Sequence, residues 1–301
     1  MFRNVTVGLD GSPESMAAAE WAAREAKLRD LSLKLINVWE PVPAPMAQAP
    51  LLGAETQAHW SERIPREAAE GLRLRHPGVK VTVEQTTGRP AGDLARAGHD
   101  ADLLVLGTRG LSGIGGFLLG SVGLAVLSQA EHPVVFVRAG EQAADEHEMD
   151  PTGIPSAATP YRPVVLGLDI DHADDSLIEF AFEEAARRGT ALGVVHGWKL
   201  PPSYAYGLSA GIDLQDEIGR QKTARLSDLL RPWQQKHPAV EVIEQSRPGS
   251  ASVHLVHAAL DASLVVVGRR IRRSPLGAHT GPVTHAVLHH STAPVAVVSH
   301  N

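Results

Sequence analysis

The residues whose types and spacing could do chemistry are glycines near the middle of the chain. An apolar run at 103–106 ends at Gly107, Gly110 follows, and nine residues then precede Gly120-Ser121. Glycine lets a backbone approach an anion closely. The first N–H groups of a helix lack partners inside the helix and attract negative charge. A buried strand, a glycine-rich loop and a helix start therefore predict a phosphate-binding loop over 107–121.

The elements that must position this loop alternate along the chain. Runs of apolar or alternating residues bounded by turn residues predict strands at 5–9, 33–39, 79–86, 103–106 and 134–137. The four prolines within 41–53 indicate a surface loop. Helices are expected at 13–29, at 55–75 with an interruption near Pro65, at 90–98 and at 120–129. This alternation predicts a parallel sheet with helices on both faces.

The same pattern then begins again. The stretch Val164-Val-Leu-Gly-Leu-Asp169 repeats Val5-Thr-Val-Gly-Leu-Asp10, and residues 262–268 repeat 101–107. We therefore expect an α/β fold of two tandem, open parallel sheets of Rossmann-like type, with five strands each. The domains are expected at 1–140 and 161–301, joined by an acidic linker at 141–160.

The loop and its surroundings resemble a known family. The spacing G-x-x-G-x9-G-[ST] after the fourth strand, the opening Val-Gly-Leu-Asp-Gly-Ser at 7–12 and the closing His-Pro-Val-Val-Phe-Val at 132–137 are similar to the ATP-binding subgroup of the universal stress protein family. The resemblance covers nearly the whole chain as two copies. It implies a fold like that of the adenine nucleotide alpha hydrolases, ATP as the ligand with Mg²⁺ left open, and a regulatory role in stress response or growth control.

The resemblance also implies which residues hold the nucleotide. Phosphates and ribose would contact the loop glycines, the serine after them and the neighbouring backbone, and the adenine end would contact the ends of the first two strands. These positions are Gly107, Thr108, Arg109, Gly110, Gly120, Ser121 and Val122 for the loop, and Gly8, Leu9, Asp10 and Val38 for the adenine end. A carboxylate such as Asp10 at a strand end can accept hydrogen bonds from adenosine; the alternative is that it caps the next helix or braces the turn at Gly11.

The second copy departs from this pattern. Gly268 matches Gly107, but Ile271 replaces Gly110 and Gly281-Pro282 replaces Gly120-Ser121. A β-branched residue tolerates positive φ poorly, and proline lacks an N–H. Arginines surround the loop, and their guanidinium groups either replace backbone amides as phosphate donors or form a solvated loop face. With Asp169 in the place of Asp10, a weaker or structural second site is expected at Asp169, Gly268, Arg269, Arg270 and Gly281, with Arg272 and Arg273 beside it.

Other chemistries lack their signatures. No G-x-x-x-x-G-K-[ST] occurs, and no G-x-G-x-x-G follows the first strand. The loop carries no general base for attack on phosphate, so we expect binding, with hydrolysis slow or absent. A slow ATPase or nucleotidyl-transfer enzyme, and a partner-binding protein with empty loops, are the alternatives. His285 and His289 have the spacing of a metal pair, but nothing nearby completes it, and ordinary surface histidines are favoured over a metal site.

Composition restricts the partners. The net charge of −6 is −1 over 1–140 (14 basic, 15 acidic residues), −5 over 141–160 and zero over 161–301, so neither half has the basic excess of a nucleic-acid-binding surface. The chain has no cysteine, and neither a signal peptide nor a long apolar span is evident. We therefore expect a cytoplasmic protein with no membrane contact. The resemblance implies pairing through the last strands, 134–137 and 295–298, a homodimer, and an unknown regulatory protein partner.

Overall fold

The computed structural model describes residues 4–40, 54–110, 117–199, 211–271 and 280–300. The chain divides into two compact units, the first from Met1 to Gln142 and the second from Ala143 to Ile271 and from Thr280 to Asn301. The loop expected at 41–53, the middle of the glycine loop and the arginines at 272 and 273 lie outside the described residues.

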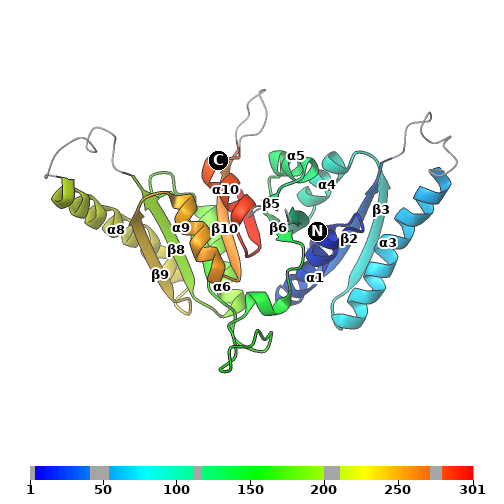
Figure 1. Ribbon diagram of the computed structural model, residues 1–301, viewed down its shortest axis with the longest axis horizontal. Coiled ribbons are helices and arrows are strands. Elements are labelled where there is room, and N and C mark those ends of the chain that lie inside the picture. Colours follow the sequence, from blue (N-terminus) through cyan, green and yellow to red (C-terminus); the bar gives the residue numbers. More distant parts are fainter. Residues whose placement is uncertain (1–3, 41–53, 111–116, 200–210, 272–279, 301) are drawn as a thin grey trace. The chain divides into compact units, whose positions relative to one another are not determined.

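The first unit is a parallel sheet whose strands lie in the order β3-β2-β1-β4-β6. This is the predicted α/β fold (Figure 1). Its elements are β1 (Asn4–Gly8), α1 (Pro13–Leu28), β2 (Ser32–Trp39), α3 (Ala54–Arg75), β3 (Val81–Thr87), α4 (Pro90–His99), β4 (Leu103–Gly110), β5 (Phe117–Leu118), α5 (Ser121–Gln129) and β6 (Val134–Arg138).

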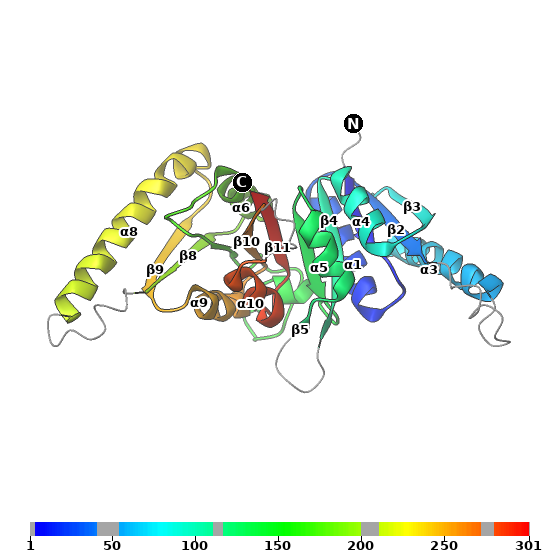
Figure 2. The ribbon, with the colours of Figure 1, turned by 90° about the horizontal axis from the view of Figure 1, so that it is seen from above.

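Helices cover both faces of this sheet. Neighbouring residues of a strand point to opposite faces, and the paired positions of Gly8 and Gly107 differ by one residue, so the two glycines face opposite sides. The Gly8 side meets Leu94 of α4, whereas the Gly107 side meets the backbone of α1. Helices α4 and α5 lie together over β4 (Figure 2). Because the strands are covered on both faces, they read as continuous apolar runs, such as Leu103–Leu106, rather than as alternating ones.

The second unit repeats this arrangement in the order β9-β8-β7-β10-β11, again all parallel. The expected α/β fold with five parallel strands in each unit is therefore confirmed. Its elements are β7 (Val164–Gly167), α6 (Asp175–Arg188), β8 (Leu192–Trp198), α8 (Gly211–Lys236), β9 (Val242–Pro248), α9 (Ala251–Ala258), η2 (Ala259–Asp261), β10 (Leu264–Arg270), α10 (Pro282–His290) and β11 (Val295–His300).

Two local expectations were wrong. The interruption expected near Pro65 does not occur, because α3 runs through this proline. An interior proline costs a helix about 3 kcal/mol, and the burial of Ala68, Ala69 and Leu72 one turn later offsets that cost. The expected loop between β4 and α5 also contains the short strand β5, which pairs with β4 in antiparallel fashion. Two residues are too few to produce a periodic signal in the sequence.

The segment expected as a linker has local structure of its own. It begins with the 3-10 turn η1 (Ala143–Glu146), and its later part doubles back through bridges between His147 and Tyr161 and between Met149 and Pro155. The carboxylate of Asp150 accepts hydrogen bonds from backbone N–H groups at the tip, including that of Ile154 at 2.9 Å. The hydroxyl of Thr152, which donates to the same carboxylate at 2.6 Å, and these backbone groups lower the pKa of Asp150. Short polar side chains bonded to nearby backbone explain how a segment without periodicity is ordered.

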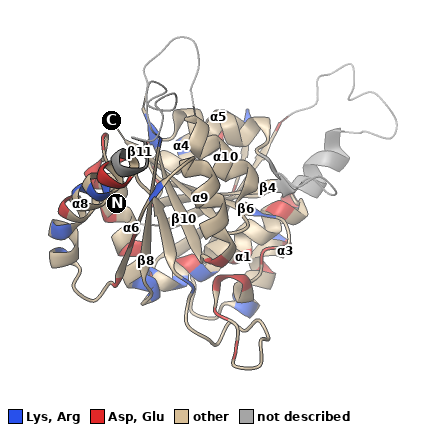
Figure 3. Ribbon diagram, turned by 60° about the vertical axis from the view of Figure 1, so that its left-hand side comes forward, with Lys and Arg blue, Asp and Glu red and all other residues tan. Residues whose placement is uncertain are grey.

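Charged side chains of both signs lie along α8 (Figure 3). Pairs three residues apart, Arg220–Glu217 and Arg231–Asp228, lie on this helix. Of the helices that the structure describes, none is both long and apolar enough to cross a membrane.

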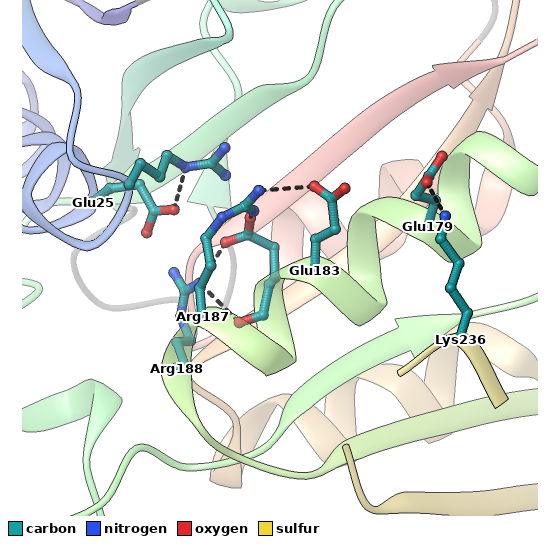
Figure 4. A network of polar contacts seen from close by, with 8 residues as sticks. Glu25, Glu179, Glu183, Arg187, Arg188 and Lys236 are labelled. Carbon is teal, nitrogen blue, oxygen red and sulfur yellow. Dashed lines mark hydrogen bonds and ion pairs between the residues drawn. The ribbon is translucent and has the colours of Figure 1, made fainter. Parts of the chain in front are cut away.

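A buried ion pair closes the last turn of α6. The side chains of Glu184 and Arg188 are both fully buried and bonded to each other, and Arg187 donates a second bond to Glu184 at 2.6 Å (Figure 4). The first unit has the same spacing at the end of α1, where Arg29 contacts the buried Glu25 at 2.6 Å. The repetition of an i, i+4 pair at one place in both copies marks it as part of the packing between helix and sheet.

Replacing Glu184 by alanine should lower the free energy of unfolding by about 3–5 kcal/mol, because Arg188 is left buried without its carboxylate. The exposed pair Asp228–Arg231 supplies the control, and Asp228→Ala should cost about 1 kcal/mol or less. Urea unfolding of both variants measures the difference. Equal effects of the two substitutions would contradict the structural role of the buried pair.

Candidate functional site

A cavity of about 330 Å³ opens at the carboxyl ends of β1, β2 and β4 in the first unit. Open parallel sheets usually bind ligands at this edge. The described residues that line the cavity come from these strand ends and from the starts of three helices, and they are Gly8, Leu9, Asp10, Ser12, Ser15, Ile36, Val38, Pro90, Leu94, Leu106, Gly107, Gly120, Ser121, Val122 and Gly123.

Three helices begin at the cavity. Helix α1 starts after its cap Ser12, α4 starts at Pro90, and α5 starts after its cap Gly120. The first hydrogen bond of α5 runs from the N–H of Leu124 to the carbonyl of Gly120. The amides of residues 121–123 precede this bond, and the first turn of α5 contains no acidic side chain. This part of the cavity therefore favours an anion.

A polar cluster lies where β1 meets α1. The Asp10 carboxylate accepts hydrogen bonds from Ser12 N at 2.9 Å and from Ser12 Oγ at 2.5 Å. Ser12 Oγ in turn accepts from Ser15 N at 3.2 Å, which caps the helix. Asp10 is exposed. It therefore braces the turn, as the alternative interpretation expected, and at the same time lines the cavity.

The opposite wall is apolar. It is formed by the side chains of Ile36 and Val38 from β2, Leu94 from α4 and Leu106 from β4. Strand alternation turns Asn37 away from this wall, and its side-chain amide donates to the carbonyl of Leu9 at 2.7 Å. That bond holds the end of β1 against β2. The cavity thus has an apolar side and a side formed by helix starts and hydroxyl groups.

Gly107 stands where the backbone of α1 touches β4. A Cβ atom at this position would lie 2.5 Å from the carbonyl carbon and oxygen of Glu14 and 2.7 Å from the nitrogen of Ser15. Gly120, in contrast, has no neighbouring atom within 4 Å of its Cβ position. The two glycines of this motif thus have different surroundings. Gly107 permits contact between helix and strand, whereas Gly120 faces open space.

Eight of the eleven residues predicted for the first site line the cavity: Gly8, Leu9, Asp10, Val38, Gly107, Gly120, Ser121 and Val122. The other three lie further along β4. Thr108 is buried and its hydroxyl donates to the carbonyl of Val137 at 3.4 Å. Arg109 and Gly110 pair with Leu118 and Phe117 of β5.

Sequence reasoning missed seven lining residues, namely Ser12, Ser15, Ile36, Pro90, Leu94, Leu106 and Gly123. A signal existed for three of them. Ser12 lies in a helix-start motif, Pro90 opens a predicted helix, and Gly123 follows the loop serine. Ile36, Leu94 and Leu106 carried no such signal, because apolar residues of strands and helices read as core.

The corresponding residues of the second unit are engaged in local contacts. Asp169 accepts from the N–H of Asp171 at 3.1 Å and lies 3.1 Å from the ring of His172. The pKa of Asp171 is lowered because Lys222 donates a hydrogen bond to its carboxylate at 2.8 Å, and Arg225 lies close. These contacts form a turn closed by charge pairs.

Arg269 does not lie on a solvated loop face. Its side chain was expected either on a solvated face or on phosphate, yet it is buried and donates to Ser299 Oγ at 2.8 Å. Burial lowers the pKa of this guanidinium. The solvated-face interpretation is therefore wrong here, because β10 continues beyond Gly268 and the pleat turns Arg269 inward. Arg270, the next residue, is exposed, and Gly281 caps α10.

The rings of His285 and His289 lie 4.2 Å apart on α10. No group of three or more metal-binding side chains occurs within the described parts of the chain.

Gly107→Ala should lower the free energy of unfolding by about 1–3 kcal/mol, because the added methyl group forces α1 away from β4. Gly120→Ala should lower the free energy of unfolding by about 1 kcal/mol or less, because alanine is a poorer N-cap residue than glycine. Thermal and urea unfolding compare the two variants. A Gly107→Ala protein as stable as the Gly120→Ala protein would contradict the close contact.

Comparison with known proteins agrees with this architecture. Residues 1–138 and 160–299 each match the model of the universal stress protein family. Over 304 residues the chain is 33% identical to a universal stress protein of Mycolicibacterium smegmatis, with 98% of this chain and 96% of that protein covered. It is 31% identical to universal stress protein Rv1996 of Mycobacterium tuberculosis over 321 residues, covering 97% and 94% of the two chains.

A solved structure shares the fold over the full length. The crystal structure of a universal stress protein from Archaeoglobus fulgidus has a TM-score of 0.69 at 17% identity, and covers 99% of this chain and 98% of that one. The two matched halves, the repeated strand order and the relatives matched over nearly their whole length lead to one assignment. The chain belongs to the universal stress protein family, with a family domain in each half.

Proposed function

We propose that the first unit binds an adenine nucleotide, with ATP as the expected ligand, and that the protein acts as a nucleotide-dependent regulator in stress response or growth control. The observation that carries this proposal is the two-sided cavity, which joins an apolar wall to three helix starts. Its volume of about 330 Å³ is within the range of small-molecule sites.

Each side of the cavity suits one part of a nucleotide. The apolar wall of Ile36, Val38 and Leu94 suits the faces of a purine ring. Asp10 and Ser12 lie between the strand ends and α1, where they suit ribose hydroxyl groups. The amides of residues 121–123 at the start of α5 suit the phosphates.

The lining favours holding a nucleotide over cleaving it. Among the lining residues that the structure describes, Asp10 is the single ionisable side chain. Its carboxylate is already bonded to Ser12. Phosphoryl transfer needs cations on the transferred group and a group that orients the nucleophile, and the described lining supplies backbone amides and hydroxyl groups instead.

The purified protein should release an adenine nucleotide on heating, or bind one in titration calorimetry, with ATP compared against ADP and AMP. Gly120→Ala should weaken binding about 10- to 100-fold, because its methyl group enters open space beside the phosphate amides and removes one charged hydrogen bond. The control is Gly92→Ala in α4, which also has open space around its Cβ position and does not line the cavity as described.

Absence of any adenine nucleotide in both experiments would contradict the proposal. Unchanged affinity in Gly120→Ala would contradict the phosphate position alone. Pairing through the last strands, β6 and β11, and a homodimer in solution remain predictions, which sedimentation with and without ATP measures.

A further inference from the structure

The two units differ where the helix that follows the third strand packs against the end of the second strand. By the sequence repeat, Val38 of β2 corresponds to Gly197 of β8, and Pro90 of α4 corresponds to Ala251 of α9. In both units this strand end faces the start of this helix.

The turn before the helix is anchored alike in both copies. The N–H of Gly88 donates to the carbonyl of Trp39 at 3.0 Å, and the N–H of Gly249 donates to the carbonyl of Trp198 at 2.7 Å. Because both turns make the same hydrogen bond, we attribute a difference in the position of the helix start to the residue under its first turn, which is Val38 or Gly197.

In the second unit nothing separates the helix from the strand. A Cβ atom at Gly197 would lie 2.5 Å from the Cα and 2.6 Å from the nitrogen of Ala251. Both are backbone atoms, so no side-chain rotation relieves the contact. The start of α9 therefore rests directly on the backbone of β8, and Figure 1 shows α9 next to this strand.

In the first unit Val38 excludes this contact. It carries a Cβ atom and two methyl groups, and its side chain lines the cavity together with Pro90 and Leu94. Carbon atoms pack at about 3.5–4.0 Å, so the Val38 side chain does not allow the start of α4 to make the direct backbone contact that α9 makes with β8. The space that results is part of the cavity.

The first turn of the last helix also differs between the two units, and a side chain at Gly123 would point toward Leu119 and Phe136. Gly123 in the first turn of α5 lines the cavity, and Thr284 takes its place in α10. Thr284 is buried, and its hydroxyl donates to the carbonyl of Gly268 at 2.8 Å. The threonine side chain thus ties the helix start to the end of β10, where the first unit has only glycine.

We infer that Val38 is the spacer that keeps the nucleotide cavity open, and that the direct helix–strand contact at Gly197 closes its counterpart, so that each chain has one adenine nucleotide site. This inference rests on the proposed function and deepens it. It explains which of the two units binds the nucleotide by the distance between a helix start and a strand end. Val38 is a positioning residue in this role, in addition to lining the cavity.

The test compares Val38→Ala with Val38→Gly by calorimetric titration with ATP. Alanine keeps the Cβ atom and so keeps α4 off the strand, and the loss of two methyl groups should weaken binding by about tenfold. Glycine removes the last obstacle, and α4 should settle onto β2 as α9 does onto β8, weakening binding by about 100-fold or more. The wild-type chain should bind one ATP. Equal affinities of the two variants, or two ATP molecules per wild-type chain, would overturn the inference while leaving the proposed function standing.

Crystal structures without ligand provide the readout that does not depend on binding. Pro90 should move toward residue 38 in Val38→Gly and stay in place in Val38→Ala, and Gly197→Ala should push Ala251 outward. An unmoved Pro90 in Val38→Gly would overturn the spacer role whatever the titrations show. A wild-type protein that binds no nucleotide while Pro90 moves as expected would contradict the proposed function and leave the spacer role intact.

Discussion

At the end of β4 the backbone of α1 lies directly against Gly107, with no side chain between them. A βαβ unit brings each helix back over the sheet. The distance between the start of the helix and the strand ends therefore determines how much space is left at the carboxyl edge of the sheet. Gly107 permits the tightest approach on the α1 face, and Val38 prevents it on the α4 face. Val38 thus leaves space on the α4 face, and this space is part of the cavity.

This edge also explains why the site suits anions without basic side chains in its described lining. Parallel topology places the carboxyl ends of strands and the amino ends of helices together. Charge complementarity therefore comes from backbone amides, which are part of the fold itself. Such an edge attracts anions even where no basic side chain faces it.

Much of this could be predicted from the sequence, because it depends on local pattern. The alternation of apolar runs and helical stretches predicted both parallel sheets, and the spacing from Gly107 to Gly120 predicted a loop that ends in a helix start. Distances between elements could not be predicted. Leu94 and Leu106 look like any buried leucine until α4 and β4 are seen to leave space between them. Gly197 looks like an unremarkable strand glycine until Ala251 is found against it. The burial of Arg269 depends on one further residue pair of β10 and β11, and strand ends are the least predictable part of a strand.

The duplication within one polypeptide has a consequence for how such a protein can diverge. In an assembly of identical subunits, every substitution appears at all equivalent positions, and a valine at one copy of a site implies a valine at the other. Here the two copies are encoded separately, so Val38 and Gly197 can differ. A difference between the two units is thus encoded in the sequence. It does not require that a ligand bound to one unit suppress binding to the other.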